Sequence, residues 1–243
     1  MVSRSELKYI QSLGQKKYRD IDGVFVAEGP KLVRELIESE NAELKKIYAL
    51  NKWVEENKNL STSIDVTAIN EAELERMSQF KTPNKVLAVV KKFEVIEPRT
   101  KDTISLVLDT IQDPGNLGTI IRIADWFGVP QIICNADCAD MYNAKVVQAT
   151  MGSIARVNVF YTDLPVWLKQ QSGTKIYAAM LEGKDVTKMN AIREGFIMIG
   201  NESVGIDKDL LPLANEKISI PRKGKAESLN AAVATGIILS YLV

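Results

Sequence analysis

Histidine is absent from the 243-residue chain, and cysteine occurs only at Cys134 and Cys138. Without histidine, catalysis by a Ser-His-Asp triad or a Cys-His pair is excluded, and a general base has to be another residue type or a substrate group. Two cysteines are too few for a structural zinc site, which takes four Cys or His ligands, or for a disulfide framework. We therefore expect no metal and two reduced, structural thiols, as is usual in the cytoplasm.

Long apolar runs and a net charge are also missing. No apolar run reaches the ~18 residues of a membrane span, and the opening MVSRSELKYI lacks the apolar core of a signal peptide. We expect a cytoplasmic protein without membrane association. Lysine and arginine together number 31, as do aspartate and glutamate, so the overall charge does not indicate a polyanionic partner. A hydrophobic fraction of 46% is ordinary for a globular protein with a full core.

Basic residues nevertheless gather near both ends of the chain. The two groups are Arg4, Lys8, Lys16, Lys17 and Arg19, and then Arg222, Lys223 and Lys225. Solvated surface is the ordinary explanation of such clusters. Contact with nucleic-acid phosphates is the alternative.

Hydrophobic periodicity predicts two α/β halves joined by a polar linker, 94–102. In the first half we expect helices over 3–19, 30–40, 52–57 and 70–78 and strands over 23–29, 45–50, 64–69 and 85–93. In the second half we expect strands over 103–109, 130–135, 156–161, 174–180, 195–200 and 217–222 and helices over 116–127, 143–151, 163–171 and 228–242. Strands that alternate with helices predict a parallel sheet. We place the domains at 1–97 and 98–243.

The segment 108–129 runs from a strand through a DPGN turn into a helix. The free N–H groups and positive dipole end of a helix start suit an anion such as phosphate. Asn116 is either the N-cap of this helix or a ligand-binding residue. Arg122, which has apolar neighbours in sequence, is either a side chain that extends to solvent or a placed functional group. The glycine spacing does not match a dinucleotide-binding fingerprint, which argues against a nucleotide-binding oxidoreductase.

Two later segments also combine glycine with polar residues. In 196–207 an apolar strand ends at Gly200 and is followed by Asn201, Glu202 and Ser203. Ligands of parallel sheets bind outside the carboxyl ends of strands, although an ordinary polar turn would have the same composition. In 217–243 a strand and a basic turn lead to E-S-L-N and a small, apolar helix, for which we expect Ser228 as the N-cap. Close packing alone would also explain that helix.

Taken in order, the three segments resemble the motifs of the SpoU/TrmH family of SPOUT RNA methyltransferases. The matching runs are DPGNLGTIIR, GNESVG and IPRKGKAESLNAAVA, spread over roughly the last 140 residues. The first half is similar to the family's small α/β RNA-binding domain, which resembles certain ribosomal proteins, through FVAEG at 25–29 and PNKVLAVV at 83–90.

The resemblance implies a fold, a cofactor and an activity. The fold is α/β, with a mainly parallel C-terminal sheet, flanking helices and a deep trefoil knot, which is rare among proteins. The activity is transfer of a methyl group from S-adenosylmethionine to a ribose 2′-hydroxyl of RNA. The cofactor would contact backbone groups and apolar side chains at Met180, Gly200, Ile220 and Leu229.

Five polar residues match the family's catalytic positions: Asn116, Arg122, Glu202, Ser228 and Asn230. In similar enzymes Arg122 is the proposed base or activator. A positional or electrostatic role is chemically easier, because an arginine pKa lies above ~12. Asn116 would orient Arg122 or the ribose, and Glu202 would stabilise the site, for instance by pairing with Arg122. Ser228 and Asn230 would shape the third motif and bind ribose or phosphate.

The family also implies a homodimer that holds RNA on its basic surfaces, so both basic clusters become candidate RNA contacts. An N-terminal RNA-binding domain is typical of the ribosomal RNA enzymes, so we favour ribosomal RNA over transfer RNA as the substrate. A non-catalytic RNA-binding member of the fold is the other alternative.

Overall fold

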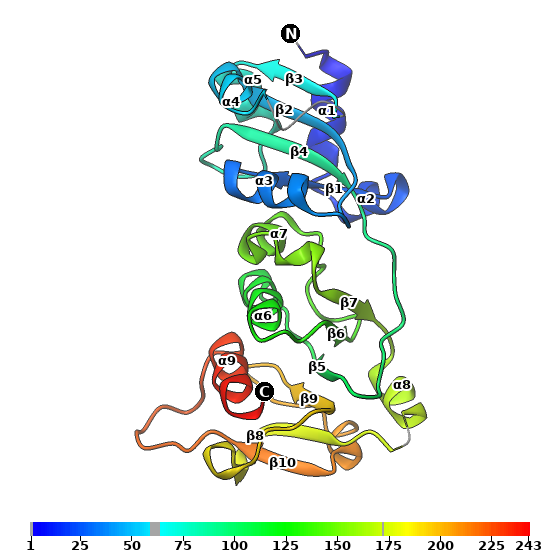
Figure 1. Cartoon of the computed structure of the whole chain (residues 1–243), viewed down its shortest axis with the longest axis vertical. Helices are drawn as coiled ribbons and strands as arrows, with labels where there is room; N and C mark the ends of the chain where they lie inside the picture. The colour runs from blue at the N-terminus through cyan, green and yellow to red at the C-terminus, as the bar shows by residue number, and fades with distance from the viewer. Residues whose placement is uncertain (1, 59–63, 172) are drawn as a thin grey trace. The chain divides into compact units, whose positions relative to one another are not determined.

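The computed structural model describes residues 2–58, 64–171 and 173–243 (Figure 1). The chain forms two compact units. The first comprises Met1–Glu94 and Tyr142–Ala155, and the second comprises Val95–Met141 and Arg156–Val243. These units differ from the contiguous domains 1–97 and 98–243 expected from the sequence, because a segment in the middle of the second half groups with the first unit. That segment, residues 142–155, lies where the sequence has no composition change that would mark a boundary.

The first unit is a four-stranded mixed sheet with helices. Its strand order is β1-β4-β2-β3, with β4 antiparallel to β1 and β2 and with β2 parallel to β3. Its elements are α1 (Arg4–Ser12), α2 (Lys16–Asp22), β1 (Val24–Glu28), α3 (Pro30–Glu38), β2 (Leu44–Leu50), α4 (Asn51–Glu56), β3 (Val66–Ile69), α5 (Glu71–Met77), β4 (Val86–Lys91), α7 (Ala144–Thr150) and the 3-10 turn η2 (Ser153–Ala155). Leucine and isoleucine side chains of α1 pack with β1, β4 and α5 in its core.

The helix expected over 3–19 is interrupted, and the interruption corrects one predicted RNA contact. α1 ends at Ser12, and Gln15 is extended before α2 begins. Arg19 of α2 is only 3% exposed, and its Nη1 donates to the carbonyl oxygens of Leu13 and Gly14, each at 2.9 Å. Because these bonds satisfy carbonyls at the break between the helices, Arg19 is structural and its guanidinium does not face solvent.

The second unit is a six-stranded sheet in which every pairing is parallel, in the order β10-β8-β9-β5-β6-β7. This confirms the predicted parallel α/β fold. Its elements are β5 (Ile104–Leu108), α6 (Pro114–Trp126), β6 (Gln131–Cys134), β7 (Asn158–Tyr161), α8 (Leu164–Gln170), β8 (Ile176–Asp185), η3 (Val186–Lys188), β9 (Gly195–Ile199), η4 (Leu211–Leu213), β10 (Glu216–Ser219) and α9 (Ala231–Leu242). The trefoil knot stays a prediction.

Strand order determines where a ligand can bind in this sheet. β5 and β9 are neighbours in the middle of the sheet. After β5 the chain runs to β6, towards the β7 edge, whereas after β9 it runs to β10 at the other edge. In open parallel sheets, loops that diverge in this way leave a crevice at the carboxyl ends of the central strands. The three motif segments follow β5, β9 and β10, so the topology brings them to the same end of the sheet.

The helices beside this crevice start at other residues than the sequence suggested. α6 begins at Pro114, and its N-cap is Asp113, whose Oδ1 accepts from the Asn116 N–H at 2.8 Å. Asn116 therefore lies inside the first turn. α9 begins at Ala231 with Asn230 as its N-cap, so the expectation that Ser228 is the cap is wrong. α9 packs against α6.

Membrane-spanning helices and metal clusters are both missing from the described residues. None of the helices there is long and apolar enough to cross a membrane. Within the same residues, no cluster of three or more Cys, Asp or Glu side chains is arranged to hold a metal ion.

Candidate active site

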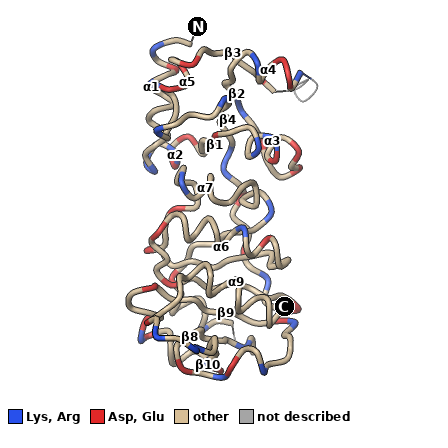
Figure 2. The backbone as a smooth tube through the Cα atoms, turned by 90° about the vertical axis from the view of Figure 1, so that its left-hand side faces the viewer, with Lys and Arg blue, Asp and Glu red and all other residues tan. Residues whose placement is uncertain are grey.

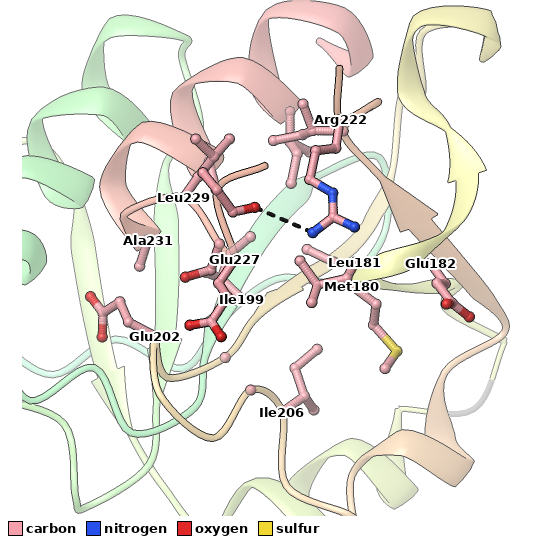
Figure 3. Close-up of a pocket in the computed structure, with 18 of the residues that line it drawn as sticks. Met180, Leu181, Glu182, Ile199, Glu202, Ile206, Arg222, Glu227, Leu229 and Ala231 are labelled. Atoms are coloured by element: carbon pink, nitrogen blue, oxygen red, sulfur yellow. Dashed lines mark hydrogen bonds between the residues drawn. The ribbon is translucent and has the colours of Figure 1, made fainter. Parts of the chain in front are cut away.

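A cavity of about 760 Å³ opens at the carboxyl ends of β9 and β10, beside the middle of β8 (Figure 3). Four parts of the chain enclose it: residues 179–182 of β8, residues 199–206 at and after the end of β9, the segment 220–229 after β10, and one face of α9. All four residues predicted to contact the cofactor line this cavity: Met180, Gly200, Ile220 and Leu229. The volume lies within the range of ~300–1,000 Å³ that small-molecule sites occupy.

The loop after β9 folds back on itself beside the cavity. Asn201 and Gly205 pair through two backbone hydrogen bonds of 3.0 and 2.8 Å. A Cβ atom at Gly200 would lie 2.3 Å from the carbonyl carbon of Gly205, which no side chain can tolerate. The glycine at position 200 is therefore required for this turn, and the turn brings main-chain groups to the cavity wall.

Asn116 joins the three motif segments through its side-chain amide. Its Nδ2 donates to Oε1 of Glu202, and its Oδ1 accepts from Nδ2 of Asn230 at 2.8 Å. Asn230 in turn accepts the N–H groups of Ala232 and Val233 at 3.0 and 3.2 Å as the cap of α9. Because both ends of the Asn116 amide are bonded, the half-buried Glu202 carboxylate is held in one orientation at the cavity.

Arg122 does not join this cluster. Its side chain is exposed on α6 and, within the described residues, makes no hydrogen bond or ion pair. The expectation that it pairs with Glu202, or that Asn116 orients it, is therefore not met in this structure. Six residues along an α-helix correspond to a rotation of about 240°, so Asn116 and Arg122 leave α6 in different directions. Ser228 lines the cavity and is exposed.

Charged side chains of both signs line the cavity. Three are carboxylates, Glu182, Glu202 and Glu227, and two are cations, Arg222 and Lys223. The Arg222 guanidinium donates to the carbonyl of Ala226 at 3.2 Å, across the turn that precedes Glu227 (Figure 3). Sequence reasoning missed Glu182 and Glu227 as lining residues. Glu227 could have been predicted, because it directly precedes Ser228 in the third motif. Glu182 could not, because it lies beyond the expected end of its strand.

The other predicted RNA contacts are spread over both units. Arg4, Lys8, Lys16 and Lys17 are exposed on α1 and α2, where Figure 2 shows basic segments in blue. Lys225 is exposed in the turn beside the cavity but does not line it. Apart from the buried Arg19, every predicted RNA contact is accessible.

The two cysteines lie outside the cavity, and both are buried and free of disulfide bonds. Burial raises the pKa of the Cys134 thiol. Cys138 accepts from the N–H of Ile111 at 3.2 Å and donates to the carbonyl of Leu108 at 3.3 Å. These contacts are those of packed thiols that help to hold the turn after β5.

Comparison with known proteins gives matches over both parts of the chain. Residues 103–240 match the SpoU rRNA Methylase family, and residues 4–88 match the MRM3-like substrate binding domain. The 23S rRNA (guanosine(2553)-2′-O)-methyltransferase RlmP of Bacillus subtilis is 30% identical over 240 residues, which are 98% of this chain and 95% of that protein.

Solved structures agree over the full length. A putative RNA methyltransferase of the TrmH family from Porphyromonas gingivalis has a TM-score of 0.87 at 32% identity and covers 99% of this chain and 98% of its own. The SpoU methyltransferase AviRb from Streptomyces viridochromogenes, in complex with AdoMet, has a TM-score of 0.85 at 26% identity. The match covers 98% of this chain and 97% of AviRb. The tRNA (guanosine(18)-2′-O)-methyltransferase of Aquifex aeolicus is 33% identical over only 60% of this chain.

Proposed function

The chain belongs to the SpoU rRNA methylase family, and from that premise we propose that it transfers a methyl group from S-adenosylmethionine to a ribose 2′-hydroxyl of ribosomal RNA. The family resemblance read from the three motifs is thereby confirmed, as is the assignment as an RNA methyltransferase. The observation that carries the proposal is the cavity, which the second and third motif segments line. The first segment is bonded to both of them through Asn116, which contacts Glu202 and Asn230.

The residues of the cavity fit S-adenosylmethionine, which supplies an electrophilic methyl group when bound. Met180, Ile199 and Leu229 offer an apolar slot for the adenine. Main-chain groups of the turn at 200–205 are available to its polar edge. The cofactor carries positive charge at its sulfonium and ammonium groups, and the carboxylates Glu182, Glu202 and Glu227 balance that charge.

The remaining residues act on RNA in this proposal. Arg222 and Lys223 line the cavity and are exposed, so they can bind phosphates next to the reacting ribose. Asn116 and Asn230 orient Glu202 within the site. Arg122, exposed and unpaired with the Glu202 carboxylate, acts electrostatically by holding an RNA phosphate, so that the ribose hydroxyl is aligned with the methyl group.

Ribosomal RNA is favoured over transfer RNA by the extent of the similarity. RlmP, which matches over nearly the whole chain, is named for methylation of 23S rRNA. A 23S rRNA (uridine(2479)-2′-O)-methyltransferase of Streptomyces viridochromogenes is 29% identical over 203 residues, which are 78% of this chain. The named transfer RNA enzyme matches over 60% of the chain. The similarity to RlmP includes residues 4–88, which match a substrate-binding domain, and this favours ribosomal RNA as the substrate.

Calorimetric titration with S-adenosylmethionine tests the cofactor, and we expect saturable binding near one site per chain. Labelled methyl transfer to 23S rRNA and to tRNA, each transcribed without modifications, then tests the substrate. Incorporation into 23S rRNA at a single ribose supports the proposal. Incorporation into tRNA alone would replace the substrate assignment, and binding of neither cofactor nor RNA would overturn the function.

We further propose a homodimer and a cytoplasmic location. Trp126 on α6 is 83% exposed, and α9 exposes Val233 and Tyr241, so these neighbouring helices present apolar surface that a second copy can cover. Size-exclusion chromatography with light scattering should give about twice the mass of the 27.0 kDa chain. A mass of one chain at micromolar concentration would contradict the dimer.

A further inference from the structure

Asp109 is a buried carboxylate that lies behind the cavity rather than in its wall. It follows β5 and is 3% exposed. Its Oδ1 accepts from Nδ2 of Asn135 at 2.9 Å and from Oγ1 of Thr110 at 3.0 Å, and its Oδ2 accepts from the backbone N–H of Asp207 at 2.7 Å. A buried carboxylate that accepts three hydrogen bonds makes strong, charge-assisted contacts.

The bond to Asp207 attaches Asp109 to the end of the turn that lines the cavity. We define residues 200–207 as the cofactor loop. Near its start, Nδ2 of Asn201 donates to the backbone carbonyl of Thr110 at 2.9 Å. The loop is therefore held at both ends by two consecutive residues, Asp109 and Thr110, and the part between the attachments lines the cavity.

Thr110 has a left-handed backbone conformation with φ of 58°. This is uncommon for a β-branched residue and persists only where the surroundings over-determine it. Here the Thr110 N–H donates to Oδ1 of Asn135 at 3.0 Å, and its hydroxyl donates to Asp109. Asp109 and Asn135 together thus hold the conformation that presents the Thr110 carbonyl to the cofactor loop.

We propose that Asp109 is a positioning residue that holds the cofactor loop in the shape that binds S-adenosylmethionine. The inference rests on the proposed function. A turn that recognises a ligand through main-chain groups has no side chain that can readjust, so a small displacement of its backbone removes several contacts together. Asp109 acts through the loop and does not line the cavity itself.

The variant Asp109→Asn tests this role with little change of volume. An asparagine can still accept from Asn135 and Thr110 through Oδ1, but its NH2 group would face the Asp207 N–H, donor against donor. The control is Ser105→Ala in the same strand, where a fully buried hydroxyl loses its bond with Gln131 at 2.6 Å. Ser105 lies towards the other end of β5 and has no contact with the cofactor loop.

We expect Asp109→Asn to weaken S-adenosylmethionine binding in calorimetry by about tenfold or more, as loss of a hydrogen bond to a charged group does. Peptides that cover 200–207 should exchange amide hydrogens faster than in the wild type. Ser105→Ala should lower the melting temperature and leave the cofactor Kd within about twofold, because the bond that it removes is remote from the loop.

Cofactor binding by Asp109→Asn within twofold of the wild type would overturn the inference, as would an equal loss in Ser105→Ala. If Asp109→Asn does not fold, Asn135→Ala is the second variant, because it removes one donor to Asp109 at a half-buried position. Weaker cofactor binding by that variant supports the role, and unchanged binding contradicts it. Failure of the wild type to bind the cofactor is a different result, since it contradicts the proposed function itself.

Discussion

Asn116 has both ends of its side chain bonded within the site, to Glu202 and to Asn230. Asn116→Ala frees the Glu202 carboxylate, and we expect kcat to fall by about 10- to 100-fold, since a small displacement of groups that position the reactants carries losses of this size. The Kd for S-adenosylmethionine should rise less than kcat falls, because Glu202 still lines the cavity and loses only its fixed orientation.

The matched control for Asn116→Ala is Asn158→Ala. This variant also removes one side-chain amide hydrogen bond, which Asn158 in β7 donates to the carbonyl of Ile96 at 2.7 Å. Asn158 lies at the amino end of its strand, away from the cavity. Single-turnover methylation measures both variants. Equal methylation rates for Asn116→Ala and the wild type would show that Asn116 has no role in methyl transfer.

Arg122 is expected to act on RNA from the surface of α6. Arg122→Ala should lower methyl transfer by at least about 100-fold, as removal of a preorganised charge at a reacting centre does, with cofactor binding intact. Arg193→Ala, which removes an exposed arginine of the same unit near the amino end of β9, should be neutral. Near-normal turnover of Arg122→Ala refutes the role.

Glu28 in the first unit gives a pH-dependent prediction. Its burial raises the pKa of the carboxyl group, although Gln79 and Ser78 donate to it. A raised folded-state pKa means that stability is fully present below the unfolded pKa and is lost as pH rises through the folded one. Glu28→Gln cannot ionise, so it should be more stable than the wild type at pH 7, and the difference should vanish near pH 4.

Thermal unfolding at pH 4, 5.5 and 7 measures this difference. Glutamine can keep both contacts, because its oxygen accepts from the Gln79 N–H and its amide can donate to the Ser78 hydroxyl. If Glu28→Gln is less stable than the wild type at pH 7 and equal to it at pH 4, the stability difference has the opposite sign. That result would contradict a buried charge that destabilises the fold.

At the scale of the element, the start of α9 combines a structural and a functional role in Asn230. Asn230→Ala removes the N-cap, and we expect the free energy of unfolding to fall by about 1 kcal/mol and activity to fall with it. Asn230→Asp keeps an acceptor for Ala232 and Val233 but has no donor for Asn116. It should therefore keep most of the stability and lose activity.

Asp163→Ala is the control that separates loss of stability from loss of the Asn116 contact. It removes the N-cap of α8, which accepts from the Val166 N–H at 3.0 Å, outside the cavity. We expect a similar loss of stability, a few degrees in melting temperature for a chain of this size, with normal methylation. If Asn230→Asp is as active as the wild type, the bond to Asn116 has no functional weight.

At the scale of the whole molecule, RNA affinity should depend on both basic clusters and on salt. Lys8, Lys16 and Lys17 are exposed on α1 and α2. Replacing all three by alanine should weaken RNA binding and reduce the slope of log affinity against log salt by about 0.7–0.9 for each phosphate that the lysines no longer neutralise. Filter binding at several salt concentrations measures the slope.

The control for the lysine triple variant is Lys52→Ala. Lys52 is 81% exposed on α4 of the same unit and pairs with Glu56 at 4.0 Å, so its removal changes charge without touching α1 or α2. An unchanged salt slope in the triple variant would place the RNA elsewhere. Cofactor binding should be the same in all of these proteins, because the altered residues do not line the cavity.

Much of the fold and of the site chemistry was determined by the sequence alone. Alternating apolar strands and amphipathic helices depend on neighbours a few positions away, so β5, α6 and β9 could be located from local patterns. The family resemblance of the motif segments identified Met180, Gly200, Ile220 and Leu229, all of which line the cavity. The absence of histidine excluded whole classes of catalysis.

Other features were decided only by the tertiary structure, because they depend on residues far apart in the chain. Arg19 looks like one more cation in a basic run, but packing buries it against the carbonyls of Leu13 and Gly14. Arg122 and Glu202 both belong to the family motifs, yet their side chains do not bond to each other. Asn116 instead bonds to Glu202 and Asn230, which lie 86 and 114 positions away in the sequence. Local periodicity describes which face of an element is apolar; only the packed chain determines which polar groups meet.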